Sequence, residues 1–368
     1  MYLSLFIVRL LLSLKSYLFA TLLSETDVSP FIFYIPAFIF LFFAYALLII
    51  KGNFVLKQKS IYWGLFFLLF CSLFNSSYFD YLFIFILMIP YISRSLLSFT
   101  KEYLGISVII MILNLSLLLL NLIPNYIFEH EKSSSPVYAL GFHNSNTFSF
   151  HMFNIICCLF ILLKQHKIIF CFLTFALMVP VFFLTGARTY SYSAFIMIIL
   201  ILTPITVRYF CHRYAMLLLF FYVIAAFLCP IYLAETFLNN LTSNRLLFLQ
   251  NALTTFPKSY YIFGMPSTIY SIFLEASPAG ALVIDSAILR FFFTKGIVGI
   301  FTLYFVLCWL IKKYQEEFLN YFPCVVSVLL AGIFESPVFM NSIVTYIIIF
   351  GVINILSYSS ENSKSQIH

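Results

Sequence analysis

Hydrophobic runs long enough to cross a membrane recur along the whole chain. A transmembrane helix needs about 20 apolar residues to cross about 30 Å of hydrocarbon. Of the 368 residues, 63% are hydrophobic and 9% charged, against about 45–50% and about 25% in soluble domains. The runs are continuous rather than alternating, which predicts helices and not the strands of an outer-membrane barrel. The sequence therefore predicts an all-α, polytopic integral membrane protein.

Twelve runs define the expected helical bundle, with a range of 10–12 spans and one large outward-facing loop. We place the runs at about 3–23, 30–50, 61–76, 79–93, 103–123, 145–163, 168–185, 190–207, 214–234, 286–311, 321–337 and 341–357. The expected organisation is an N-terminal bundle of about nine spans (1–234), the loop (235–285), C-terminal spans (286–357) and a cytoplasmic tail (358–368).

The distribution of lysine and arginine predicts the orientation. Basic residues concentrate in alternate loops, and cytoplasmic loops carry this excess in membrane proteins. Twelve spans with both termini in the cytoplasm fit the alternation. The net charge of +7 is thus a topology signal, and no basic-aromatic cluster indicates nucleic acid.

Two segments fit this scheme less simply. The first run contains Arg9 and Lys15, which are costly at mid-membrane and must snorkel or face protein. The runs at 61–76 and 79–93 are short and can instead form a re-entrant hairpin around the Asn-Ser-Ser turn at 75–77. Whether these two runs cross twice or form a re-entrant hairpin, the following segments stay on the same sides of the membrane.

Several chemistries lack their sequence signatures. The chain has no P-loop, no G-x-G-x-x-G, no H-E-x-x-H and no G-x-S-x-G, so nucleotide-driven chemistry is not indicated. The eight cysteines lie in or beside the apolar runs, and no C-x-x-C pairs with another, so neither a zinc site nor a disulfide framework is indicated. We expect no metal and no cofactor, and a substrate that is already activated.

Three arginines fall on the expected outer side, against the general bias. Arg188 lies in a short junction between two runs, Arg245 early in the large loop, and Arg290 near the top of the run that follows the loop. The guanidinium is a planar fork of five donors that suits phosphate oxygens. The alternative is that each arginine pairs with an acidic neighbour or a lipid headgroup.

Asp285 opens the run after the loop. At helical spacing, Asp285, Leu289, Phe292, Gly296 and Gly299 fall near one face. The glycines would let another helix approach closely, which places the carboxylate at the outer mouth of the bundle. The alternative for Asp285 is a helix N-cap and nothing more.

A second polar cluster, with His143, Asn144 and Asn146, stands at the outer start of the run at 145–163. Polar residues at a membrane face line cavities, and asparagines also cap helices. The sequence leaves both functions open.

Taken in order, these segments resemble the Wzy-type O-antigen and capsule polymerases and the related O-antigen ligases. The similar parts are the dozen runs with one large late loop, the Gly-Phe-His-Asn-Ser-Asn-Thr segment at 141–147, and Leu-Thr-Gly-Ala-Arg at 184–188. The stretch from Asn244-Arg245 to Asp285 and the two following glycines completes the resemblance, which covers about 100–310. Ser145 departs from the family's His-Pro-Asn type of segment.

The resemblance implies a metal- and nucleotide-independent glycosyltransferase in the bacterial cytoplasmic (inner) membrane. Its partners would be donor and acceptor oligosaccharides on undecaprenyl pyrophosphate, membrane lipid, and a chain-length regulator and a flippase. The expected catalytic residues are Asp285, Arg188, Arg245 and His143. The expected pyrophosphate- and glycan-binding residues are Arg188, Arg245, Arg290, Lys258, Lys295, Asn144 and Asn146.

Two alternatives accompany the polymerase. O-antigen ligases carry a histidine followed by a small polar residue, then nine residues, then Gly-x-x-Gly. This chain has Asp285-Ser286 in place of the histidine pair, with the same nine-residue gap to Gly296 and Gly299. That difference favours polymerase over ligase, which would move finished polymer to lipid A-core. In another class, a lipid-linked oligosaccharide flippase would have repeat-related halves and charges buried in mid-span, neither of which the sequence indicates.

Overall fold

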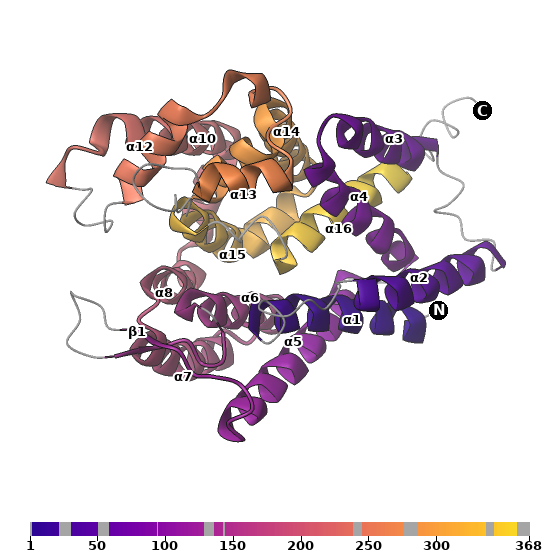
Figure 1. Cartoon of the computed structure of the whole chain (residues 1–368), viewed down its shortest axis with the longest axis horizontal. Coiled ribbons are helices and arrows are strands. Elements are labelled where there is room, and N and C mark those ends of the chain that lie inside the picture. The colour runs from indigo at the N-terminus through magenta and orange to yellow at the C-terminus, as the bar shows by residue number, and fades with distance from the viewer. Residues whose placement is uncertain are drawn as a thin grey trace. The chain divides into compact units, whose positions relative to one another are not determined.

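The computed structural model shows an all-α protein, as predicted (Figure 1). The structure describes residues 2–21, 31–50, 59–93, 95–128, 136–142, 144–237, 245–275, 286–335 and 342–358. Among these residues the only sheet is one two-stranded antiparallel ladder, in which Ile127 pairs with Tyr138. The chain divides into two compact units, residues 1–57 with 89–201 and residues 58–88 with 202–368.

Unit 1 is built on α6, which packs against α5, α7 and α8. The pair α1 and α2 packs together, and α1 also contacts α5. Its elements are α1 (Tyr2–Thr21), α2 (Phe31–Ile50), η3 (Ile89–Ser93), α5 (Leu96–Leu119), β1 (Ile127–Phe128), β2 (Val137–Tyr138), α6 (Ser145–Leu163), α7 (Lys167–Thr185) and α8 (Arg188–Ile201).

Unit 2 is built on α14, which packs against α10, α13, α15 and α16. Helices α3 and α4 pack together and both contact α16. Its elements are α3 (Lys59–Phe74), η2 (Ser76–Tyr78), α4 (Phe79–Met88), α9 (Ile205–Arg213), α10 (Ala215–Leu233), α12 (Arg245–Thr255), η4 (Lys258–Tyr260), α13 (Ser267–Glu275), α14 (Ala287–Lys313), α15 (Gln315–Phe334) and α16 (Ile343–Tyr358).

The number of membrane-crossing helices is smaller than the dozen predicted. In the described ranges, six helices are long and apolar enough to cross a membrane, or seven if α8 and α9 form one broken span. The expectation counted every apolar run as a crossing. Five of the apolar helices are shorter than 18 residues, and a straight crossing takes about 20. Helix α4, with 10 residues, is the clearest case.

Arg9 of α1 faces protein, which is one of the two arrangements expected for it. Its guanidinium carbon lies 4.4 Å from the ring centre of Phe99 and 4.9 Å from that of Tyr103. One of its nitrogens is 3.9 Å from the carboxylate of Glu102, which also accepts a 2.5 Å hydrogen bond from Tyr91. A buried arginine is tolerated where an opposite charge and aromatic faces replace water. The side chain of Lys15 lies outside the described part of the structure.

Helix α14 is broken at Gly296, where φ is 67° and ψ is −168°. This backbone conformation is almost confined to glycine. The sequence predicted one unbroken run at 286–311, with Gly296 on a helical face that another helix approaches. The break at Gly296 shows that this prediction was wrong. What approaches the glycine is not another helix but a turn, since a Cβ here would collide with the backbone of Ile262 and Gly264.

The turn at 261–265 takes up backbone groups that the break leaves without helical partners. Ile297 N–H donates to Tyr261 O over 2.8 Å, and Val298 N–H to Ile262 O over 3.1 Å. In return, Met265 N–H donates to Phe293 O over 2.7 Å. Irregular backbone in a membrane protein requires such replacement, because each unpaired polar group in hydrocarbon costs several kcal/mol.

Adding one methyl group at position 296 tests whether the protein needs the break in α14. We expect Gly296→Ala to destabilise the protein by about 1–3 kcal/mol through backbone strain alone, with the collision against Ile262 and Gly264 adding to it. The control is Gly105→Ala in α5, where a Cβ meets nothing within 4 Å; it should be neutral or stabilise by about 0.5–1 kcal/mol. Thermal unfolding in detergent measures both, and equal midpoints would contradict the role of the break.

Candidate functional site

Polar side chains from the turn between α3 and α4 close around the break in α14. Asn75 Nδ2 donates to Phe263 O over 2.7 Å and to Thr294 O over 2.8 Å. Ser77 Oγ donates to the same Thr294 carbonyl over 2.7 Å. Asn75 is 1% exposed and its own Oδ1 accepts from Ser77 N–H. One asparagine therefore joins three segments that are far apart in the sequence.

Lys295 occupies the centre of this cluster. It is 1% exposed, and its ammonium donates to Ser77 O. The ammonium nitrogen lies 5.1 Å from the ring centre of Tyr78 and 5.0 Å from that of Tyr81, within the range of cation–π attraction. The hydroxyl of Tyr78 donates to Lys295 O over 2.5 Å. The cation stands at the C-terminal end of the first half of α14, where the helix dipole favours positive charge.

Arg290 lies on the same half of α14, about one turn earlier. It is half-buried and near enough to Tyr81 to act on it electrostatically. The carboxylate of Asp80, an exposed residue in the first turn of α4, acts electrostatically on Lys295. Two predicted binding residues, Arg290 and Lys295, thus lie near Tyr81, a residue that no sequence motif indicated.

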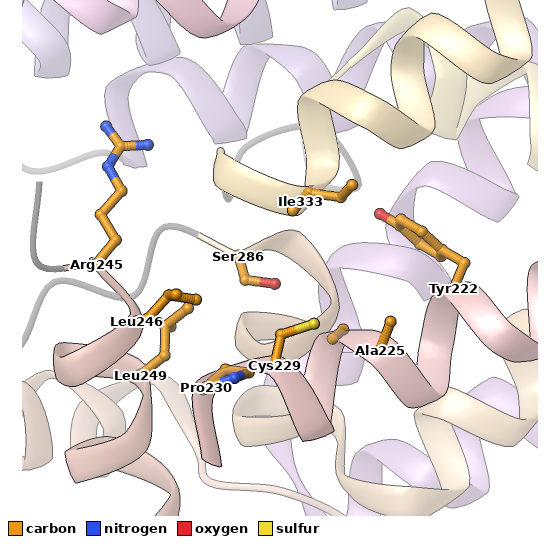
Figure 2. A pocket seen from close by; sticks show the side chains of 10 residues that line it. Tyr222, Ala225, Cys229, Pro230, Arg245, Leu246, Leu249, Ser286 and Ile333 are labelled. Atoms are coloured by element: carbon orange, nitrogen blue, oxygen red, sulfur yellow. The ribbon is translucent and has the colours of Figure 1, made fainter. Parts of the chain in front are cut away.

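Arg245 forms a second site at the start of α12. Its Nη1 lies 3.5 Å from Oε1 of Glu335, and Glu335 is 4% exposed. Arg245 also borders a pocket of about 110 Å³. Figure 2 shows its guanidinium directed away from Cys229 and Pro230 on α10. The pocket therefore has one cation at its edge and an interior that is largely apolar.

The rest of this pocket comes from three helices of unit 2, α10, α12 and α15, and from Ser286, the residue before α14. Ser286, 3% exposed, lies in its middle in Figure 2. Tyr222 of α10 stands opposite Arg245, and its hydroxyl donates to Leu329 O of α15 over 2.9 Å. Ser286 is the residue after Asp285, and Asp285 itself lies outside the described residues.

The remaining predicted residues are distributed as follows. Arg188 is the first residue of α8 and is exposed. Two residues before it, Gly186 ends α7 with a left-handed φ of 60°. Asn144 caps α6, with its Oδ1 accepting from Asn146 N–H over 2.8 Å. Lys258 is exposed in η4, and His143 lies outside the described ranges.

These positions divide the predicted site residues between the two units. Arg188, Asn144 and Asn146 belong to unit 1, whereas Arg245, Lys258, Arg290 and Lys295 belong to unit 2. Within unit 2, Arg245 lies at the pocket of α10 and α12, and Arg290 and Lys295 lie beside α4.

Several residues of these sites were missed by sequence reasoning. No sequence motif marks Glu335, Tyr78 or Tyr81. The useful signal was Asn-Ser-Ser at 75–77, a polar turn between two runs too short to cross. Among the described residues, no group of three or more histidine, cysteine or acidic side chains could hold a metal.

Comparisons of the chain with family models, with curated proteins and with solved structures gave no match. The resemblance to Wzy-type polymerases therefore stays a prediction made from motifs.

The Asn75 junction gives a prediction with a neighbouring control. Asn75→Ala removes the donor to Phe263 O and one of two donors to Thr294 O. A buried carbonyl left without its donor costs about 1–3 kcal/mol, so we expect a loss of that size in thermal unfolding. Ser76→Ala, at an exposed position of the same turn, should stay within about 0.5 kcal/mol. A loss equal to that of Ser76→Ala would show that the turn does not hold α14.

Proposed function

We propose that the protein is a membrane glycosyltransferase of the Wzy polymerase type. It would join repeat units carried on undecaprenyl pyrophosphate at the outer face of the bacterial cytoplasmic membrane. One observation carries the proposal: Arg245 stands at the edge of a largely apolar pocket lined by α10, α12 and α15, held by the buried carboxylate of Glu335. Ligand sites are commonly apolar with a few placed polar groups, and this combination suits an amphiphile with an anionic head.

The proposed reaction needs no nucleotide. The hydroxyl oxygen of the acceptor sugar forms a bond to the anomeric carbon of the donor glycan, and the bond from that carbon to the pyrophosphate oxygen breaks. Undecaprenyl pyrophosphate leaves with the bonding electron pair. Its developing charge requires fixed cationic donors, the role we give to Arg245; Arg188 is assigned the same role on the resemblance alone. The acceptor proton passes to a general base, for which Asp285 is the candidate and His143 the reserve.

Glu335 explains how Arg245 is kept ready. An arginine loses much conformational freedom when it binds a phosphate, and a carboxylate partner restricts it beforehand. The pair is 3.5 Å apart, longer than the 2.7–2.9 Å of a strong charge-assisted hydrogen bond. The guanidinium presents five N–H donors, so a phosphate can bind Arg245 while Glu335 keeps its own contact.

The proposal is tested by the length of the surface polysaccharide. We expect Arg245→Ala and Arg188→Ala each to lower polymerisation by about 10²–10³-fold, as removal of one charge-stabilising donor does elsewhere. Asp285→Ala, which removes the proposed general base, should lower it by about 10²–10⁴-fold. The ladder on a gel should shorten toward single repeat units at equal membrane levels. Lys313→Ala, at the exposed far end of α14, is the control and should keep full-length polymer. Full-length polymer from all three site variants would exclude the assignment.

The ligase alternative differs in its product. Loss of a ligase leaves finished polymer on its lipid carrier, whereas loss of a polymerase leaves single repeat units joined to the core. One gel of a deletion strain separates them.

A transporter is the second candidate, and the break in α14 favours it. Discontinuous helices with a buried charge line substrate sites in many transporters, and Gly296 with buried Lys295 has this form. The purified protein in vesicles decides between the two functions. A translocator moves a fluorescent lipid-linked oligosaccharide between leaflets without lengthening it, and Lys295→Met should abolish that movement. A polymerase lengthens the oligosaccharide.

A further inference from the structure

Unit 2 contains an apolar cavity that the proposed reaction does not use. It has a volume of about 170 Å³ and is lined by α3, η2, α4, α14 and α16, with Phe67, Phe85, Leu303, Val306 and Ile349 among the lining residues. The hydroxyl of Thr302, which also borders it, is taken up by Val298 O at 2.7 Å. Away from Tyr78 and Tyr81 the walls are almost wholly apolar, and an apolar cavity does not hold water, so its natural occupant is hydrocarbon.

The cavity follows the second half of α14 and the neighbouring α16. Its lining runs from Gly299 to Val306 on α14 and from Thr345 to Val352 on α16, each roughly 10 Å at 1.5 Å per residue. One leaflet of a bilayer contributes about half of the 30 Å hydrocarbon thickness. The cavity therefore has the length to take much of a single lipid chain.

One end of the cavity is polar and cationic. Tyr78 and Tyr81 belong to the lining, and the same two rings lie 5.1 Å and 5.0 Å from the ammonium nitrogen of Lys295. Arg290 directly precedes the lining residue Phe291, whose ring centre lies 5.7 Å from that of Tyr81. Both Arg290 and the carboxylate of Asp80 act electrostatically on Tyr81, so Arg290 and Lys295 outnumber the one acidic group at this end. Tyrosines with basic side chains are what a lipid headgroup meets at a membrane interface.

We propose that this cavity binds one acyl chain of an anionic phospholipid from the surrounding bilayer, with the phosphate at Arg290. The charge of that end selects an anionic lipid over a neutral one, and the bilayer supplies phospholipid directly to helices that cross it. Arg290 then serves lipid binding rather than the pyrophosphate of the substrate. The proposal is independent of the glycosyltransferase function, because the pocket of Arg245 has other lining residues.

Native mass spectrometry of the detergent-purified protein tests the cavity. Phosphatidylglycerol is added, and the fraction of protein that retains one lipid is measured. Val306→Trp fills the deep end, and exclusion of even two methylene groups weakens binding about tenfold. Phe305→Trp, at a 63% exposed neighbour outside the lining, is the control and should bind as the wild type does. Val352→Phe, on the α16 wall, repeats the test if Val306→Trp elutes as aggregate.

The headgroup is tested by changing lipid and charge. Phosphatidylglycerol should be retained several-fold more than phosphatidylcholine, and Arg290→Gln should remove that preference while leaving chain binding. Equal retention of the two lipids by the wild type overturns the proposal, as does unchanged binding by both cavity-filling variants. Retention of undecaprenyl phosphate with none of phosphatidylglycerol also overturns it, because the occupant would then be an isoprenoid carrier.

Discussion

A backbone broken between membrane helices must find new hydrogen-bond partners, and unit 2 is arranged around that requirement. At Gly296 the helix α14 leaves its regular path. The turn at 261–265 pairs with the freed groups on both sides of the break. Asn75 and Ser77 supply the donors that the Thr294 carbonyl needs. Three distant segments converge here because hydrocarbon offers no water to replace any of them.

The same junction accounts for the buried charge. Lys295 is the residue before the break, so its carbonyl and its ammonium both point into the cluster, toward Tyr78 and Ser77. An isolated ammonium in the interior would be very costly. Here it meets a carbonyl, two aromatic faces and the C-terminal dipole of a half-helix. Both the transporter alternative and the proposed lipid site draw on this buried lysine.

Much of the candidate site could be named from the sequence, but its grouping could not. The outward arginines stood out by charge alone, since Arg245 and Arg290 break the bias of basic residues toward the other side. Their partners were not predictable. Glu335 meets Arg245 across 90 residues, and Tyr81 meets Lys295 across more than 200. Contacts between residues so far apart leave no trace in local spacing.

By itself, the sequence determined that this protein is helical and membrane-embedded. Apolar runs of sufficient length leave the backbone no other way to pair its polar groups in hydrocarbon. It also indicated that Arg9 must snorkel or face protein, because of the cost of its charge. Only the tertiary structure decided how many helices are long enough to cross and that Gly296 marks a break rather than a close helix contact. Glycine spacing fits either outcome, and which one occurs depends on whether another segment, here 261–265 with Asn75, is in place to pair the freed backbone.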